Sequence, residues 1–200
     1  MKRTMSMTRL AAIVAAGALA LTGCVGSGGD TGSSEHEKAG DHQQQAGGQQ
    51  EGHAHQEDGG EPPSGITKAS DPRFSVGDEV VLTADHMDGM DGAEATISGA
   101  FDTTAYSISY TPTDGGDPVS NHKWVVQEEL EDEDGRSLKD SPLKGGSQAV
   151  TTADHMPGMK GAEVTVDGST AETVYMVDVT MDGMTMTNHK WVVESEIEAA

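Results

Sequence analysis

Apolar and polar residues alternate along short segments in the last two thirds of the chain, and a two-residue period of this kind is typical of half-buried β-strands. In residues 104–111, for example, Tyr106, Ile108 and Tyr110 alternate with small residues. The segment Glu-Glu-Leu at 128–130 predicts a single helical turn before a last short pairing, and the chain has no convincing 3.6-residue period. The sequence therefore predicts a mainly β protein. Its first strands are expected at residues 75–83, 93–101, 104–111 and 122–127.

The strand pattern occurs twice because this region is an internal duplication. Residues 83–111 match residues 152–180 at 15 of 29 positions. After a two-residue deletion, the sequence at 120–130 matches the sequence at 187–197. The chain therefore contains two repeats of about 60 residues each.

Four or five short antiparallel strands in so few residues predict a small SH3-like or KOW-like β-barrel for each repeat. We expect two tandem barrel domains, at residues 65–136 and 137–200. Trp124 and Trp191 are expected to fill the interiors of their barrels. Because a unit of this size buries only a marginal core, the two repeats are expected to lean on each other.

The first 23 residues predict a secretory signal peptide. A basic start precedes an apolar run at 10–21 that is too short to span a membrane comfortably. Cys24, the one cysteine of the chain, follows Leu-Thr-Gly as in the lipobox of bacterial lipoproteins. The alternative is an ordinary signal peptide with a cysteine at its cleavage site. We expect Cys24 to carry the lipid that anchors the exported protein in the cell membrane, facing the extracellular side.

Residues 24–64 predict the lipidated cysteine followed by a disordered acidic tether rich in Gly, Gln and His, because after Val25 they contain no aromatic or large aliphatic residue. His36, His42, His53 and His55 lie in this tether. A solvated tether can carry histidines without a purpose, whereas the spacing of His53 and His55 would suit weak capture of a divalent metal.

The charge balance excludes nucleic acid as a partner. The formal net charge is −22, and removal of the signal peptide leaves nine basic against 34 acidic residues, about −25. Phosphate binding needs a basic surface, whereas this chain attracts cations. Acidic side chains also keep a protein with a small core soluble, which is the alternative interpretation.

Methionine use changes the picture further, because the chain after Cys24 has eight methionines and four leucines. Leucine is normally the commonest residue, and packing alone favours it. Thioether and imidazole groups without a thiol suit copper, Cu(I) in particular, and exclude hard ions. All eight methionines lie in or beside the repeats, with His86, His122, His155 and His189 nearby.

Each candidate ligand also has a structural interpretation. The His-Met-x-Gly-Met motif at 86–90 and 155–159 predicts either a glycine turn capped by packed methionines or a loop that presents ligands. Residues 181–186 of the second repeat replace a polar turn of the first, which favours three exposed methionine ligands, Met181, Met184 and Met186. His122 and His189, in the repeated Asn-His-Lys-Trp motif, are either buried structural residues or ligands.

Catalytic motifs are missing from the sequence: it has no thiol nucleophile, nucleophile elbow, HExxH or phosphate-binding glycine loop. A paired-carboxylate mechanism also finds no support, because an acidic surface supplies carboxylates without pairing them. We therefore do not expect an enzyme.

The motif HMxGMxGAxxT, followed by TxY and NHKWVV, occurs twice behind a lipobox and a polar tether. This arrangement resembles the YdhK-type family of tandem-domain bacterial lipoproteins and, within it, the copper-resistance lipoproteins of the CopL type. The resemblance covers about residues 74–197 and implies small tandem β-domains on an extracellular, membrane-attached protein. For the copper-resistance members it implies copper binding that limits toxicity. The residues that match the motif are His86, Met87, Met90, His155, Met156 and Met159.

These observations predict a membrane-anchored extracellular lipoprotein that binds copper and buffers or sequesters it. Its expected partners are the lipid bilayer, the metal ion and a copper transporter, and we expect a monomer. The alternative is a non-catalytic SH3-like module that binds the cell wall and carries structural methionines.

Overall fold

The computed structural model describes residues 56–181 and 183–200, which form β-strands and two single-turn 3₁₀-helices. The predicted signal peptide, Cys24, His53 and His55 lie outside the described residues. Within the described residues, no helix has the length and apolar character needed to cross a membrane. The elements are β1 (Thr67–Lys68), β2 (Glu79–Leu82), β3 (Glu94–Asp102), β4 (Ala105–Tyr110), β5 (Val119–Val126), η1 (Gln127–Glu129), β6 (Leu130–Glu131), β7 (Gln148–Thr151), β8 (Glu163–Thr170), β9 (Val174–Met181), β10 (Met184–Val193), η2 (Glu194–Glu196) and β11 (Ile197–Ala199).

The prediction of a mainly β protein is confirmed, and the alternation of side chains explains the strands. In β8, for example, Val164 and Val166 are buried and Glu163 and Thr165 are exposed. The helical turn expected at 128–130 is η1, which the short strand β6 follows. The second repeat has the same features in η2 and β11.

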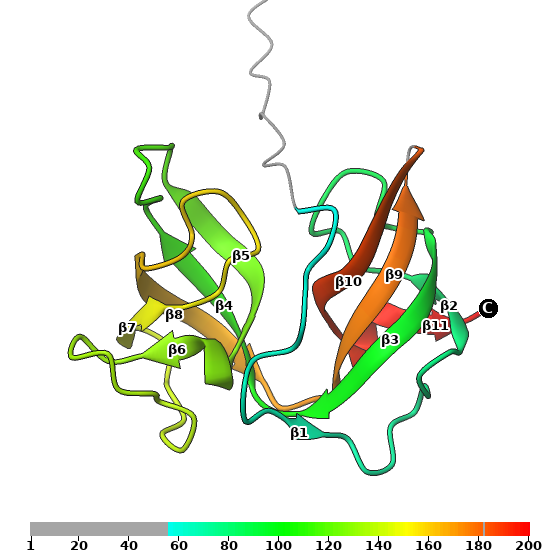
Figure 1. Ribbon diagram of the computed structural model, residues 1–200, viewed down its shortest axis with the longest axis horizontal. Helices are drawn as coiled ribbons and strands as arrows, with labels where there is room; N and C mark the ends of the chain where they lie inside the picture. Colours follow the sequence, from blue (N-terminus) through cyan, green and yellow to red (C-terminus); the bar gives the residue numbers. More distant parts are fainter. Residues whose placement is uncertain (1–55, 182) are drawn as a thin grey trace, which may run out of the picture. The chain divides into compact units, whose positions relative to one another are not determined.

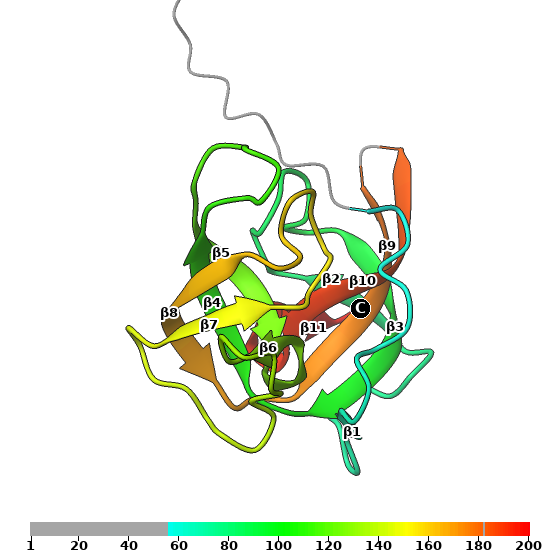
Figure 2. The ribbon, with the colours of Figure 1, turned by 60° about the vertical axis from the view of Figure 1, so that its left-hand side comes forward.

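The strands form two antiparallel sheets, and each sheet contains strands of both repeats. Sheet 1 has the order β10-β9-β3-β2-β11, with β1 paired to β3, and sheet 2 has the order β5-β4-β8-β7-β6. Thus β3 and β4, which follow each other directly in the sequence, belong to different sheets, as do β8 and β9 (Figures 1 and 2). The sheets therefore do not follow the predicted boundaries 65–136 and 137–200.

The exchange is reciprocal, as the strand registers show. Phe101 of β3 pairs with Val174 of β9, and their counterparts in the other repeat, Thr170 of β8 and Ala105 of β4, also pair. Because the repeats are homologous, β9 finds in β3 the partner that β8 of its own repeat would offer. The duplication thus explains why strands can change places without changing their pairing.

Each sheet covers its own apolar core, and a third apolar cluster links the two sheets. The core of sheet 1 includes Leu82 and Tyr175, and the core of sheet 2 includes Leu130 and Tyr106. The third cluster takes residues from strands of both sheets: Phe101, Ala105, Val126, Val174, Met176, Trp191 and Val193, with Ile66 and Trp124 packed against them.

The two tryptophans belong to this linking cluster, so the expectation that each fills the interior of its own barrel is wrong. Trp191 is fully buried there, with its ring 5.7 Å from that of Phe101, and Trp124 is partly buried. Both follow a lysine through a cis peptide bond, and the asparagines at the start of the two motifs, Asn121 and Asn188, both have φ 51°. Asparagine tolerates this left-handed backbone better than most residues.

The His-Met-x-Gly-Met motifs form matching glycine turns. The N–H groups of Met90 and Met159 donate to the carbonyl oxygens of Met87 and Met156, each at 3.2 Å. In the first repeat, Gly89 and Gly92 have φ values of 79° and 81°, which a side chain would strain. Met90 and Met159 are fully buried in the cores of sheets 1 and 2. The motif therefore forms a glycine turn whose second methionine packs in the core.

Candidate metal centre

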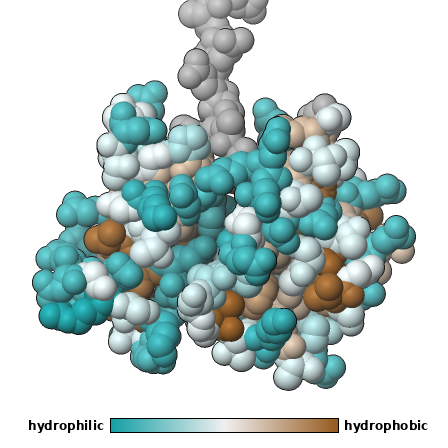
Figure 3. All heavy atoms as spheres, in the orientation of Figure 1, coloured by the Kyte–Doolittle hydropathy of each residue, from teal (hydrophilic) through white to brown (hydrophobic). Residues whose placement is uncertain are grey.

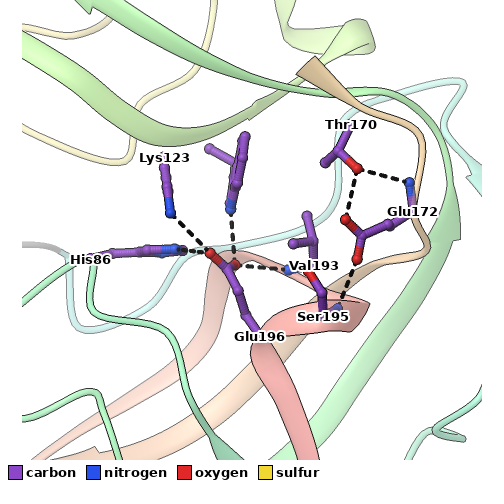
Figure 4. A network of polar contacts seen from close by, with 8 residues as sticks. His86, Lys123, Thr170, Glu172, Val193, Ser195 and Glu196 are labelled. Carbon is purple, nitrogen blue, oxygen red and sulfur yellow. Dashed lines mark hydrogen bonds and ion pairs between the residues drawn. The ribbon is translucent and has the colours of Figure 1, made fainter. Parts of the chain in front are cut away.

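Two glutamates, one per repeat, organise the polar groups between the sheets: Glu129 is buried and Glu196 is half-buried. In the first network, which we call the Glu196 network, the Glu196 carboxylate lies 2.8 Å from Nε2 of His86. Trp124 of sheet 2 donates its indole N–H to the same carboxylate at 2.9 Å, and the Val193 N–H donates at 3.2 Å. Lys123 Nζ lies 3.4 Å from it (Figure 4).

The second network, which we call the Glu129 network, is the counterpart with the repeats exchanged. The Glu129 carboxylate lies 2.9 Å from Nε2 of His155 and accepts the indole N–H of Trp191 at 2.9 Å. It also accepts the Val126 N–H at 3.1 Å. Each tryptophan therefore bonds to a glutamate at the edge of the other sheet, and each network ties the two sheets together.

Both glutamates are held as carboxylates. Burial opposes the ionisation of Glu196, but the hydrogen bond and charge of His86, with the Trp124 and Val193 N–H groups, lower its pKa from 4.5 to about 2. Burial opposes ionisation of Glu129 more strongly, and the charge and hydrogen bond of His155 together with the other donors still lower its pKa. Such a glutamate is a hydrogen-bond acceptor at neutral pH.

When the His155 ring is neutral, the ionised Glu129 fixes which of its nitrogens carries the proton. A carboxylate only accepts hydrogen bonds, so Nε2 of His155 must be the donor, and in the neutral ring Nδ1 then carries a lone pair. Nδ1 of His155 is buried and has no hydrogen-bond partner among the described residues. A histidine that gives one N–H to a carboxylate and keeps the other nitrogen open has the arrangement of a metal ligand with an orienting carboxylate.

A second imidazole lies close to His155, and Met156 follows His155 directly in the sequence. The His122 ring of the other repeat is 6.5 Å from the His155 ring, centroid to centroid. Two imidazoles that share one metal ion, each about 2 Å from it, have centroids about 6 Å apart at most, so the two rings would have to move closer together to bind one ion. The Tyr110 hydroxyl contacts the buried sulfur of Met156 at 3.8 Å, and the Tyr110 ring lies 6.2 Å from that of His122. We call His155, His122 and Met156 the His155 centre.

The corresponding position in sheet 1 differs in its chemistry. The lysine ammonium of Lys123 lies beside the Glu196 carboxylate and places a positive charge next to His86 (Figure 4). In the Glu129 network the equivalent Lys190 instead donates to the carbonyl oxygen of Glu61 at 2.6 Å. Tyr110 also has no aromatic counterpart, since Val179 occupies its place. The repeats therefore carry two related networks of different character.

The remaining predicted methionine ligands lie mostly in the core. Met181 and Met186 are buried in the core of sheet 1, so the expectation that residues 181–186 expose three methionines is wrong for both. The β9–β10 hairpin turns them inward because it continues the alternation of its strands. Met184 is 48% exposed, and Met87 is partly buried against the core of sheet 1.

The two histidines of the Asn-His-Lys-Trp motif, His122 and His189, differ in their surroundings. His189 is buried, as its structural interpretation predicts, whereas His122 is brought next to His155. Within residues 56–181 and 183–200, no three His, Cys, Asp or Glu side chains converge in a way that could hold a metal ion. A metal at the His155 centre would therefore depend on sulfur from Met156 as well as on imidazole nitrogen.

Sequence reasoning missed Glu129 and Glu196. Each follows the tryptophan of its repeat by five residues, in QEEL and ESEI, and this shared position was a usable signal. The abundance of acidic residues hides this signal. In addition, the histidine that each glutamate contacts lies far away in the sequence.

The surface offers little for apolar association. Figure 3 shows a face that is mainly hydrophilic, with apolar residues scattered over it. Among the described residues, the exposed large hydrophobic side chains are Val76 and Met184. An apolar docking patch would need many more such side chains side by side.

Comparisons with known proteins agree with the duplication. The model of a family described as "Protein of unknown function (DUF1541)" matches residues 76–127 and 145–194. The chain is 48% identical over 139 residues to the "Uncharacterized protein YdhK" of Bacillus subtilis strain 168, an alignment that covers 68% of this chain and 65% of that protein, just under two thirds of its length.

Solved structures of the same relative have a similar fold. A crystal structure of the DUF1541 family protein YdhK of B. subtilis is 46% identical, with a TM-score of 0.65 over 70% of this chain and 94% of that one. A solution structure of the YdhK C-terminal domain is 50% identical, with a TM-score of 0.57 over 63% of this chain and 93% of that one.

Proposed function

This chain belongs to the DUF1541 family, and on that premise we propose that it is an extracellular copper-binding protein that holds the metal at the His155 centre. The observation that carries the proposal is the buried Nδ1 of His155, which has no hydrogen-bond partner among the described residues while Nε2 is oriented by Glu129. A buried polar atom without a partner is costly, and a metal ion would satisfy it.

The donor set favours copper over other ions. His155 and His122 supply imidazole, Met156 supplies a thioether, and the chain has no thiol other than Cys24. Soft thioether sulfur with imidazole suits Cu(I), whereas Mg²⁺ and Ca²⁺ need oxygen ligands. Copper is here the cargo of the protein, which binds it stoichiometrically and so limits its free concentration outside the cell.

Titration with Cu(I) against a competing chelator tests this function. The full chain carries Cys24→Ser so that the thiol does not bind the metal. We expect one site whose affinity falls at least tenfold in His155→Asn, the order of loss seen when a ligand or its orienting partner is removed. An affinity unchanged in His155→Asn would contradict the assignment.

The pseudo-symmetry supplies a matched control. His86→Asn removes the equivalent histidine–glutamate hydrogen bond from the Glu196 network, so it reproduces the structural damage without touching the His155 centre. We expect copper affinity close to that of the unsubstituted protein. Met87→Leu serves in the same way as the control for Met156→Leu. Equal losses of copper affinity in a variant and its control would show that copper does not distinguish the two networks.

The location of the protein forms part of the proposal. Lipidation of Cys24 would hold the chain on the extracellular face of the cell membrane, where it could act as a monomer or pass copper to a transporter. Cells grown with a labelled fatty acid should incorporate the label into the unsubstituted protein and not into Cys24→Ala. Label in both proteins would contradict the lipid anchor.

A further inference from the structure

A pocket of about 490 Å³ lies between the segment at residues 59–64 and the η1–β6 end of sheet 2. Its lining is strongly acidic, with five carboxylates against one lysine. The carboxylates are those of Glu61, Glu128, Glu129, Glu131 and Asp154, and the lysine is Lys190. We call this cavity the acidic pocket.

The carboxylates extend from the surface to the interior. Glu61 and Asp154 are exposed, Glu128 and Glu131 are half-buried, and Glu129 is buried. A cleft lined by one sign of charge attracts ions of the opposite sign and raises their local concentration. This gradient of burial leads a cation from solvent toward Glu129.

His155 lies in the wall of the same pocket. It is 8% exposed, and its Nδ1 has no hydrogen-bond partner among the described residues. This observation is independent of the acidic lining and itself points to a ligand. The pocket therefore combines a carboxylate-lined opening with a histidine whose buried Nδ1 has no hydrogen-bond partner among the described residues.

The segment before β1 builds the pocket on this side of the molecule. Gly59 donates to the Thr187 carbonyl oxygen at 2.9 Å, the Asn188 side chain donates to Asp58 at 3.3 Å, and Gln56 donates to the Asp154 carbonyl oxygen at 2.7 Å. This segment places Glu61 opposite η1. In the other repeat the counterpart of Glu128 is Ser195, so that position carries no charge.

We propose that the acidic pocket is an entrance for cations, which attracts a metal cation by the charge of its carboxylates and gives it access to Nδ1 of His155. This inference rests on the proposed function for the identity of the centre that the cation reaches. It adds an electrostatic role for the outer carboxylates of the pocket, which control how fast the metal binds and not how tightly the His155 centre holds it.

Association kinetics test the entrance, with Ag(I) in chloride-free buffer as an air-stable soft cation. The Trp191 ring lies 6.4 Å from the His155 ring, so tryptophan fluorescence reports binding. In Glu131→Gln/Asp154→Asn we expect the association rate to fall about threefold or more at low salt, with the dissociation rate unchanged. The difference should shrink as the ionic strength rises, because salt screens the attraction.

The control also removes two negative charges, each at the position that corresponds to Glu131 or Asp154 in the opposite repeat. Asp85→Asn/Glu198→Gln changes the net charge equally but leaves the acidic pocket intact. We expect its association rate to stay within twofold of the unsubstituted protein. Equal slowing in both double variants would show that the field of the whole molecule acts, and it would overturn the entrance.

A second probe separates the entrance from the proposed function. Mn²⁺ prefers oxygen ligands and broadens nearby NMR signals. We expect the amide signals of Gly59, Glu131 and Thr152 to broaden in the unsubstituted protein and in His155→Asn, and to stay sharp in Glu131→Gln/Asp154→Asn. Sharp signals in the unsubstituted protein would overturn the entrance. Broadening without any copper binding would leave the entrance in place and overturn the proposed function.

Discussion

Trp191 of β10 donates its indole N–H to the buried carboxylate of Glu129, at 2.9 Å, although the two residues belong to different repeats and different sheets. Trp124 and Glu196 make the same contact in the opposite direction, also at 2.9 Å. Strand exchange and these reciprocal contacts join the two sheets, and each sheet contains strands of both repeats.

Replacing Trp191 by phenylalanine should destabilise the fold more than replacing Trp124. Each substitution removes a hydrogen bond to a charged acceptor, which is worth about 1.5–3 kcal/mol. Trp191 is fully buried, and the buried Glu129 oxygen then keeps only the Val126 N–H, whereas Glu196 is partly solvated and has Lys123 beside it. Urea unfolding of the two variants measures the difference, and a larger loss in Trp124→Phe would contradict it.

Acid should weaken the Glu196 network. The pKa of Glu196 in the folded protein, about 2, lies below its ordinary value of 4.5. The stabilisation is therefore fully present above pH 4.5 and is lost as the pH falls toward about 2, and a shift of this size corresponds to on the order of 3 kcal/mol. Urea unfolding of the metal-free protein should show a gap between the unsubstituted protein and Glu196→Gln at pH 6.

That gap should narrow as the pH falls from 4.5 toward 2, because the protonated glutamate resembles glutamine. Other carboxylates also titrate in this range, so the comparison rests on the difference between the two proteins and not on either curve alone. A gap that stays constant across this interval would show that His86 and Trp124 do not hold the charge of Glu196.

The strands, the glycine turns and the duplication could be predicted from the sequence because they are local. Alternation, Gly89 and Gly92 at turn positions and the shared motif all act within a few residues. Strand exchange could not be predicted, since β9 meets a homologous strand whether it pairs with β3 or β8. Nothing in the sequence distinguishes two partners that carry the same pattern.

A single repeat should therefore fail to fold as a monomer. In residues 137–200, β8 and β9 lack the strands of the first repeat that pair with them, β4 and β3. Pairing of β8 with β9 would replace these partners, but the linking cluster would still lose Phe101, Ala105 and Val126. A second copy of the same repeat supplies homologous strands and side chains, so we expect a strand-exchanged dimer or an unfolded chain. Light scattering and circular dichroism distinguish these states, and a folded monomer would contradict the argument.

The candidate site was only partly predictable for the same reason. The motif drew attention to His155 and Met156, and the contact with His122 of the other repeat depends on the exchanged topology. The excess of methionine over leucine in the sequence predicts copper binding, yet most of the methionine side chains fill the cores. A thioether is apolar enough to pack and soft enough to bind metal, so composition alone does not separate the two roles.

Met90 and Met159 are the positions at which these two roles can be separated. Both are fully buried in their cores, so Met→Leu should cost less than about 1.5 kcal/mol and Met→Ala about 2–5 kcal/mol, by the loss of packing. Because neither belongs to the His155 centre, we expect Met90→Leu and Met159→Leu to bind Cu(I) with the affinity of the unsubstituted protein. Thermal unfolding and the chelator titration, applied to the same samples, measure both effects. A leucine variant that keeps its stability and loses copper would return that methionine to the ligand set.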